Sequence, residues 1–158
     1  LVVHSEQVRN KALEAVMRHP ELPIDAEFVG EACLLHDIGI FLCHAPGIYC
    51  FGKHEYIEHG YLGSDLLKEE GLPKHALVAE RHTGTGFTKA EIVQKKLPLP
   101  HRDMLPVSLE EQLICYADKF YSKSKLNIQL TVEEIRQNLS SYGKEKVEKF
   151  DSWHKLFG

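Results

Sequence analysis

The sequence lacks any apolar run close to the ~20 residues that a helix needs to cross a bilayer, so we expect no membrane-spanning segment. It also lacks an excess of basic residues, because 19 lysines and arginines stand against 23 acidic residues and give a formal net charge of −4. Nucleic-acid binders usually carry a basic surface. We therefore expect neither a membrane nor a nucleic acid as the partner.

The four cysteines include no Cys-x-x-Cys pair. Cys33 and Cys115 lie in apolar helical stretches, where a free cysteine behaves as a small hydrophobic residue. The composition indicates a reduced protein of the cytoplasm, with a Cys43–Cys50 disulfide as the alternative. No signal peptide is recognisable. Because the chain begins without methionine and already in a helical pattern, we expect some residues to precede Leu1.

No stretch of useful length alternates apolar and polar residues, so the sequence predicts no substantial sheet. Helical spacing dominates instead. It predicts helices over about 4–19, 26–38, 54–70, 74–82 and 143–156. Three further helix starts are marked by a Ser or Thr with Glu three places later, the capping-box pattern: Thr88/Glu91, Ser108/Glu111 and Thr131/Glu134.

The length of 158 residues allows one hydrophobic core, and neither a repeat nor a linker divides the chain. We therefore predict a single all-α domain over residues 1–158, a helical bundle of about six to eight helices. The aromatic and glycine-containing segment 40–53 is predicted to be a loop that packs against this body.

Histidine is abundant, with 10 residues, roughly three times the average usage. A dication needs several imidazoles or carboxylates from different elements. His4 lies on the apolar stripe of the first helix, His36 and Asp37 close the second, and Asp118 lies in the apolar stretch "ICYADKF". An isolated buried carboxylate is strongly unfavourable. One cation would satisfy all four groups.

The ordered set His4, His36-Asp37 and Asp118 resembles the H…HD…D signature of the HD-domain superfamily of metal-dependent phosphohydrolases. The letters "HDIG" at 36–39 resemble the hallmark of one subfamily. Three further stretches resemble small stand-alone HDIG hydrolases of archaea and bacteria: "HGYLGSDLLKEEGLP", "ERHTGTGFTKAE" and "LPHRDMLPVSLEEQLICYADKF". The resemblance covers about residues 2–157.

The resemblance implies that His4, His36, Asp37 and Asp118 hold one metal, with His36, Asp37 and Asp118 at the catalytic centre. It further implies that Asp37 bridges to a second metal, which His59 and His82 complete. The alternative is that His59 and His82 bind substrate phosphate directly.

Two details of the second site stay open at this stage. His54 is a rival to His59, because a later helix start would turn His54 inward. The small Gly63 on the face of His59 is expected to leave room for a ligand.

The resemblance implies hydrolysis of a phosphate ester or anhydride, in a nucleotide or related small molecule, by a metal-activated water. Imidazole-rich sites suit Fe, Mn, Co or Ni better than Mg, which stays possible. The alternatives are a dinucleoside polyphosphate hydrolase, a non-catalytic metal-binding sensor and a di-iron oxygenase. Arg81, Arg102 and Lys119 are candidate substrate-binding residues, and Lys53 and Lys123 are further cations in or near loops.

Overall fold

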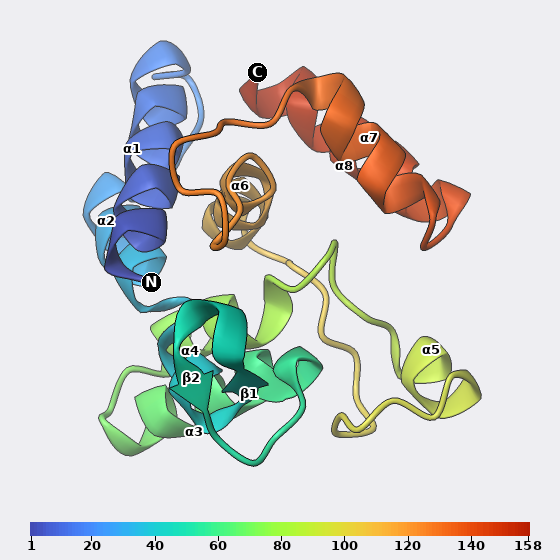
Figure 1. Ribbon diagram of the computed structural model, residues 1–158. Helices are drawn as coiled ribbons and strands as arrows, with labels where there is room; N and C mark the ends of the chain where they lie inside the picture. The colour runs from blue at the N-terminus through green and yellow to red at the C-terminus, as the bar shows by residue number, and fades with distance from the viewer.

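The computed structural model describes all residues 1–158 and confirms the all-α prediction (Figure 1). It contains eight α-helices: α1 (Val2–Arg18), α2 (Ala26–Leu35), α3 (His59–Glu69), α4 (Pro73–Arg81), α5 (Lys89–Gln94), α6 (Leu109–Asp118), α7 (Val132–Ser140) and α8 (Lys144–Phe157). Three short 3-10 helices accompany them: η1 (Ile38–Leu42), η2 (Pro46–Ile48) and η3 (Tyr56–Glu58). No helix combines the length and the apolar character that crossing a membrane requires.

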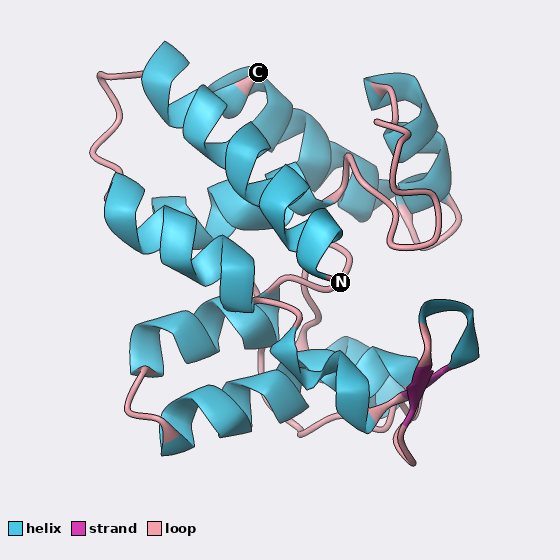
Figure 2. Cartoon of the chain, turned by 60° about the vertical axis from the view of Figure 1, so that its left-hand side comes forward, coloured by secondary structure: helices cyan, strands magenta, loops and turns pink.

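Helix α6 lies at the centre of the molecule. Figure 1 shows it end-on between the α1–α2 pair and the α7–α8 pair, with α3 and α4 below, and Figure 2 shows the same helices after a 60° turn. The largest apolar cluster, of 19 buried residues, surrounds it and includes Leu113, Tyr116, Phe150 and Trp153. The Trp153 indole N–H donates to Gln112 Oε1 at 3.0 Å, so its one polar atom is satisfied. Asp118, the last residue of α6, therefore stands on a well-packed element.

All three predicted capping boxes are present. In α5, α6 and α7 the Ser or Thr side chain accepts from the backbone N–H of the Glu three residues on, and that Glu accepts from the N-cap N–H. Asp25 caps α2 in a simpler way, accepting from the Phe28 N–H at 3.1 Å. Each such cap stabilises a helix start by about 1 kcal/mol.

The second helix ends earlier than predicted, at Leu35 rather than Ile38. His36 keeps helical torsions, but Asp37 has φ −102° and ψ 13° and begins the separate 3-10 helix η1. The two residues therefore lie at a junction between helices.

A backbone contact between Gly39 and Gly63 fixes this junction against α3. A Cβ on Gly39 would lie 2.3 Å from the His59 carbonyl oxygen and 2.5 Å from the Gly63 nitrogen. A Cβ on Gly63 would lie 3.1 Å from the Gly39 nitrogen. The expectation that Gly63 leaves room for a ligand was therefore wrong, because it makes room for the η1 backbone.

The segment 40–53 also differs from its prediction as a packed loop. It contains η1, η2 and a hairpin of two short antiparallel strands, β1 (His44–Ala45) and β2 (Cys50–Phe51), with His44 opposite Phe51. Cys43 and Cys50 are buried as free thiols, whereas Tyr49 is 88% and Phe51 71% exposed. Two-residue strands are too short to show an alternating pattern, so they could not be predicted from the sequence.

Candidate metal centre

All six predicted metal ligands meet in the interior, and none is more than 8% exposed. They come from five places in the fold: α1, the α2–η1 junction, the start of α3, the end of α4 and the end of α6. Their donor atoms form two groups, each within 4.8 Å, that share one carboxylate. We call His4, His36, Asp37 and Asp118 the first group, and Asp37, His59 and His82 the second group.

The first group surrounds two carboxylates with imidazole nitrogens. His4 Nε2 lies 2.9 Å and His36 Nε2 3.2 Å from Asp118 Oδ1. The same two nitrogens lie 3.3 and 3.1 Å from Asp37 Oδ2.

The surroundings of Asp37 Oδ2 show whether the residues of the first group fit a metal ion. Lys123 Nζ also approaches it, at 3.2 Å, yet none of its three nitrogen neighbours has the geometry of a hydrogen bond to this buried oxygen. Buried polar atoms in proteins are normally hydrogen-bonded. A buried carboxylate oxygen with three nitrogen neighbours and no hydrogen bond fits a cation held at this point.

The second group is held in a defined tautomeric state. His59 Nδ1 lies 2.6 Å from the Tyr56 carbonyl oxygen, and His82 Nδ1 lies 2.7 Å from the Ala79 carbonyl oxygen. A carbonyl can only accept, so both Nδ1 atoms carry the proton of the neutral ring. The two Nε2 atoms therefore present lone pairs, and they face each other at 3.1 Å. A cation between the two nitrogens would replace the repulsion of their lone pairs by attraction.

One local device orients three of the four imidazoles. His36, His59 and His82 are the C-cap residues of α2, η3 and α4. Each ring bonds through Nδ1 to the carbonyl three residues earlier, which for His36 is Cys33 at 2.6 Å. The final carbonyls of a helix have no partner within it, so the ring caps the helix while Nε2 turns to the site.

The electrostatics keep the donors of the second group in the form that binds metal. Burial, together with the charge of His82, lowers the pKa of His59 to about 3, and burial lowers the pKa of His82. Burial opposes ionisation of Asp37 and Asp118, but neighbouring histidines and lysines hold the pKa of both carboxyls well below the usual range. Metal ligands must be deprotonated, and four of the six meet that condition near neutral pH.

His36 lies beside the two carboxylates of the first group, which favour the protonated form of its ring. Burial lowers its pKa, but Asp37 and Asp118 outweigh that effect and raise the pKa to about 10. Without a metal, a proton on His36 therefore supplies positive charge between two carboxylates.

The other predicted site residues lie outside the cluster, except Lys119. Lys119 Nζ donates to Asp118 Oδ2 at 2.7 Å and to the His82 carbonyl at 3.1 Å. Arg81 pairs with the buried Glu111 at 2.6 Å, and Arg102 pairs with the buried Glu80. Substrate binding by these three residues stays a prediction, although each has an internal partner.

The structure places the two rival histidines in different surroundings. His54 is exposed and lies 3.3 Å from Glu58, whereas His59 is buried in the second group. Sequence reasoning did not place Tyr56 or Lys123 in contact with the ligands. The Tyr56 ring lies tilted against His59 with ring centroids 4.6 Å apart, and Lys123 forms an ion pair with Asp37. The Lys123–Asp37 pair joins residues far apart in the chain, so local sequence carries no signal for it.

Comparison with known families agrees with this geometry. The HD domain family model matches residues 1–123, which include every residue of both groups. The chain belongs to the HD-domain family. HD domains bind divalent metal ions, and the His/Asp cluster of this HD domain is able to hold one.

Relatives of this HD domain occur alone and within longer chains. An uncharacterized protein of Methanocaldococcus jannaschii is 34% identical over 143 residues, covering 88% of this chain and 77% of the relative. Two enzymes named tRNA (cytidine(56)-2'-O)-methyltransferase are also similar. The one from Picrophilus torridus is 32% identical over 66% of this chain and 27% of the enzyme, and that from Thermoplasma volcanium 27% identical over 94% and 40%. The chain thus spans less than half of either methyltransferase, and no solved structure gives a significant match.

Proposed function

We propose that this protein is a metal-dependent phosphohydrolase that cleaves a phosphate ester or anhydride of a nucleotide or related small molecule. The observation that carries the proposal is the sharing of Asp37 between two buried groups of donors. In this proposal His4, His36, Asp37 and Asp118 hold one ion, and Asp37, His59 and His82 hold a second. Asp37 then orients the two sites relative to each other.

Bound divalent ions lower the pKa of a coordinated water toward neutrality and offset the negative charge of a phosphoryl group. The protein supplies the orientation. Lys119 fixes Asp118 through its Oδ2 atom, and the backbone carbonyls at the helix ends fix three imidazole rings. Because such outer contacts hold ligands in one orientation, they contribute to both metal affinity and activity.

A count of charges supports an anionic substrate. The two carboxylates Asp37 and Asp118 are already matched by the ammonium groups of Lys119 and Lys123, which lie 2.7 and 3.2 Å away. Each divalent ion then adds positive charge that no further carboxylate of the cluster offsets. Uncompensated charge in a buried site is costly, so an anion such as phosphate is the ligand that balances it.

The donor chemistry favours iron, manganese, cobalt or nickel, because imidazole nitrogen dominates both groups and magnesium prefers oxygen. We propose a small phosphorylated molecule rather than tRNA as the substrate, despite the two methyltransferase relatives. The chain matches less than half of either enzyme, and its net charge of −4 provides no general basic surface.

A substrate screen tests the proposal. Protein loaded with Mn, Co, Ni or Fe is incubated with mononucleotides, dinucleoside polyphosphates, sugar phosphates and a short RNA, and released phosphate is measured with and without oxygen. We expect phosphate release from at least one small molecule, independent of oxygen. Asp37→Ala is expected to lose both turnover and tight metal binding. Unaltered turnover in that variant would refute the assignment, and oxygen-dependent turnover would indicate an oxygenase.

A further inference from the structure

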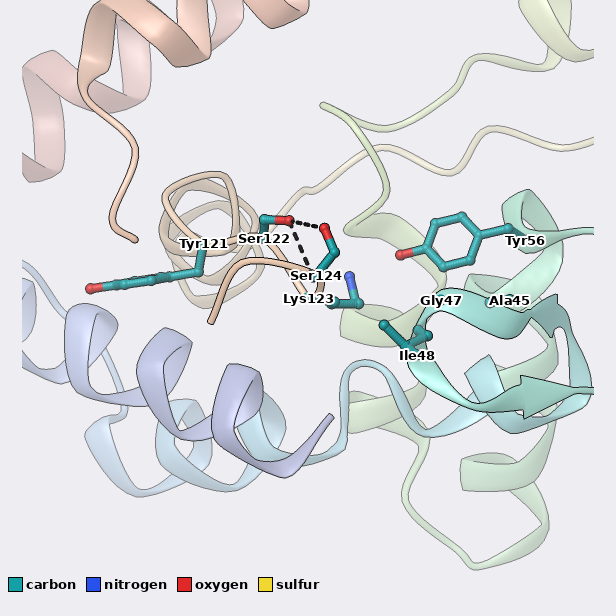
Figure 3. Close-up of a pocket in the computed structure, with 8 residues that line it drawn as sticks. All are labelled: Ala45, Gly47, Ile48, Tyr56, Tyr121, Ser122, Lys123 and Ser124. Carbon is teal, nitrogen blue, oxygen red and sulfur yellow. Dashed lines mark hydrogen bonds between the residues drawn. The ribbon is translucent and has the colours of Figure 1, made fainter. Parts of the chain in front are cut away.

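A cavity whose wall includes two neighbours of the candidate metal centre, Tyr56 and Lys123, lies between the hairpin side of the molecule and the loop that follows α6. Its volume is about 410 Å³, within the range that small-ligand pockets occupy. One wall is made by Ala45, Gly47 and Ile48 around η2, and another by the loop residues Ser122, Lys123 and Ser124. Figure 3 shows the Tyr56 hydroxyl and the Lys123 ammonium group pointing toward each other across this space.

Two residues of the cavity wall touch the metal ligands. Lys123 Nζ lies 3.2 Å from Asp37 Oδ2, the carboxylate shared by both groups. The Tyr56 ring lies tilted against the ring of His59 of the second group, with the centroids 4.6 Å apart. The six ligands are themselves almost fully buried, so a substrate must reach them past a wall of this kind. This cavity provides such a wall, because Lys123 and Tyr56 contact the ligands Asp37 and His59.

The lining also has the chemistry of a phosphate ester. Lys123 offers a cation, and Tyr56, Ser122 and Ser124 offer hydroxyl groups. On the opposite side the wall is apolar, and Figure 3 shows the Ile48 side chain directed toward Lys123. An ammonium group with several hydroxyls suits phosphoryl oxygens, and an apolar wall suits an organic group.

Lys123 lines the cavity, whereas the other cations near the cluster do not. Arg81 and Arg102 are paired with buried glutamates, and neither lines the cavity. Lys119 is held by both Asp118 and the His82 carbonyl. Lys123 alone among the four both lines the cavity and contacts a residue of the cluster that a phosphate would approach.

We propose that this cavity is the substrate site, that Lys123 and Tyr56 bind the phosphoryl group beside the metal centre, and that the η2 wall receives the organic part. The inference rests on the proposed function and narrows its substrate to a phosphate ester whose organic group packs against the apolar η2 wall. Lys123 and Tyr56 are therefore the residues that set affinity for the substrate.

Binding of inorganic phosphate tests the site without requiring turnover. Its Kd is measured by calorimetry on Mn-loaded protein, with metal content determined for each sample. Lys123→Met is expected to weaken binding by about 10- to 100-fold, the loss of one charge-assisted hydrogen bond. Tyr56→Phe is expected to weaken it by a few fold. Lys125→Met, an exposed lysine two residues further along the same loop, is the matched control and should leave Kd unchanged.

A second variant is needed because Lys123 contacts Asp37, so that Lys123→Met can weaken phosphate binding through a loss of metal. Ser124→Trp places a bulky side chain at an exposed position on the cavity wall, away from every ligand, and is expected to weaken phosphate binding at unchanged metal content. Unchanged phosphate affinity in both Ser124→Trp and Lys123→Met would overturn the substrate site.

The two proposals can fail separately. If Lys123→Met weakens phosphate binding and no substrate in the screen is turned over, the site stands and the phosphohydrolase proposal falls. If a substrate is turned over with unchanged KM in Lys123→Met and Ser124→Trp, the phosphohydrolase proposal stands and this site falls.

Discussion

Two regions of the molecule bury charge, and they do so in opposite ways. The Arg81–Glu111 pair sets one cation against one anion, and Glu111 also completes the capping box of α6. The His/Asp cluster at the other end of the same helix instead gathers several donor atoms at one point, where Asp37 Oδ2 has no hydrogen bond and the Nε2 atoms of His59 and His82 face each other at 3.1 Å. Buried charge alone therefore does not mark a functional site. The mark is a set of buried donors whose atoms converge closely enough to share a cation.

The largest effect should come from Asp118→Asn, which keeps the shape of the side chain but removes a charge from the first group. We expect turnover to fall by about a thousandfold, at the upper end of what one preorganised electrostatic group contributes. Elemental analysis should show the loss of at least one equivalent of metal in Asp118→Asn. The control is Asp151→Asn, a half-buried aspartate paired with Arg136, in which less than one equivalent should be lost. Equal metal content in the two variants would contradict the ligand role of Asp118.

The two rival histidines give the next comparison. His59→Ala should weaken binding of the ion in the second group and lower turnover by about 10- to 100-fold, the range seen when a metal site is weakened rather than lost. His54→Ala should leave metal content and turnover unchanged, because the exposed His54 side chain pairs with Glu58 and not with the cluster. Metal content is the deciding measurement, and a loss caused by His54→Ala would reverse the assignment.

The Arg81–Glu111 pair should affect stability and not chemistry. Glu111→Gln retains a capping side chain but leaves the Arg81 cation without its partner, which we expect to lower the free energy of unfolding by about 2 kcal/mol. Urea unfolding measures this, with Glu133→Gln on the exposed first turn of α7 as the control. Metal content should be unchanged, and a loss of metal would show that the pair belongs to the site after all.

The smallest expected effect is a change in the stability contribution of Glu111 as the pH is lowered. Burial opposes ionisation of Glu111, but its bonds to Arg81 and Ser108 lower the pKa below the ordinary value. A lowered folded-state pKa contributes stability above the unfolded pKa of about 4.5, and this is lost as pH falls through the folded value. The stability difference between the native protein and Glu111→Gln should therefore shrink as the pH is lowered from 6 to 3. A difference that stays constant would mean that the charge of Glu111 contributes nothing.

The sequence predicts some features because their signals are local. Thr88 and Glu91 of a capping box are three residues apart. His4 can be recognised because it is a polar group on an apolar helical stripe. The six-residue set also required the family resemblance, since spacing alone left His54 and His59 undecided. The remaining features depend on elements that meet only in the folded chain. The Gly39–Gly63 contact and the ion pairs Arg81–Glu111 and Lys123–Asp37 have no local signature.

The C-cap histidines restrict how this site can be re-engineered. At positions 36, 59 and 82 the ring gives an N–H to a helix carbonyl and a lone pair to the cluster at the same time. An aspartate or a cysteine thiolate in any of these places could still donate electrons to a metal, but it has no N–H for the carbonyl. Changing metal selectivity by exchanging ligand types would therefore cost about 1–3 kcal/mol of folding stability at each position. Only His4, whose Nδ1 has no partner, is free of that penalty.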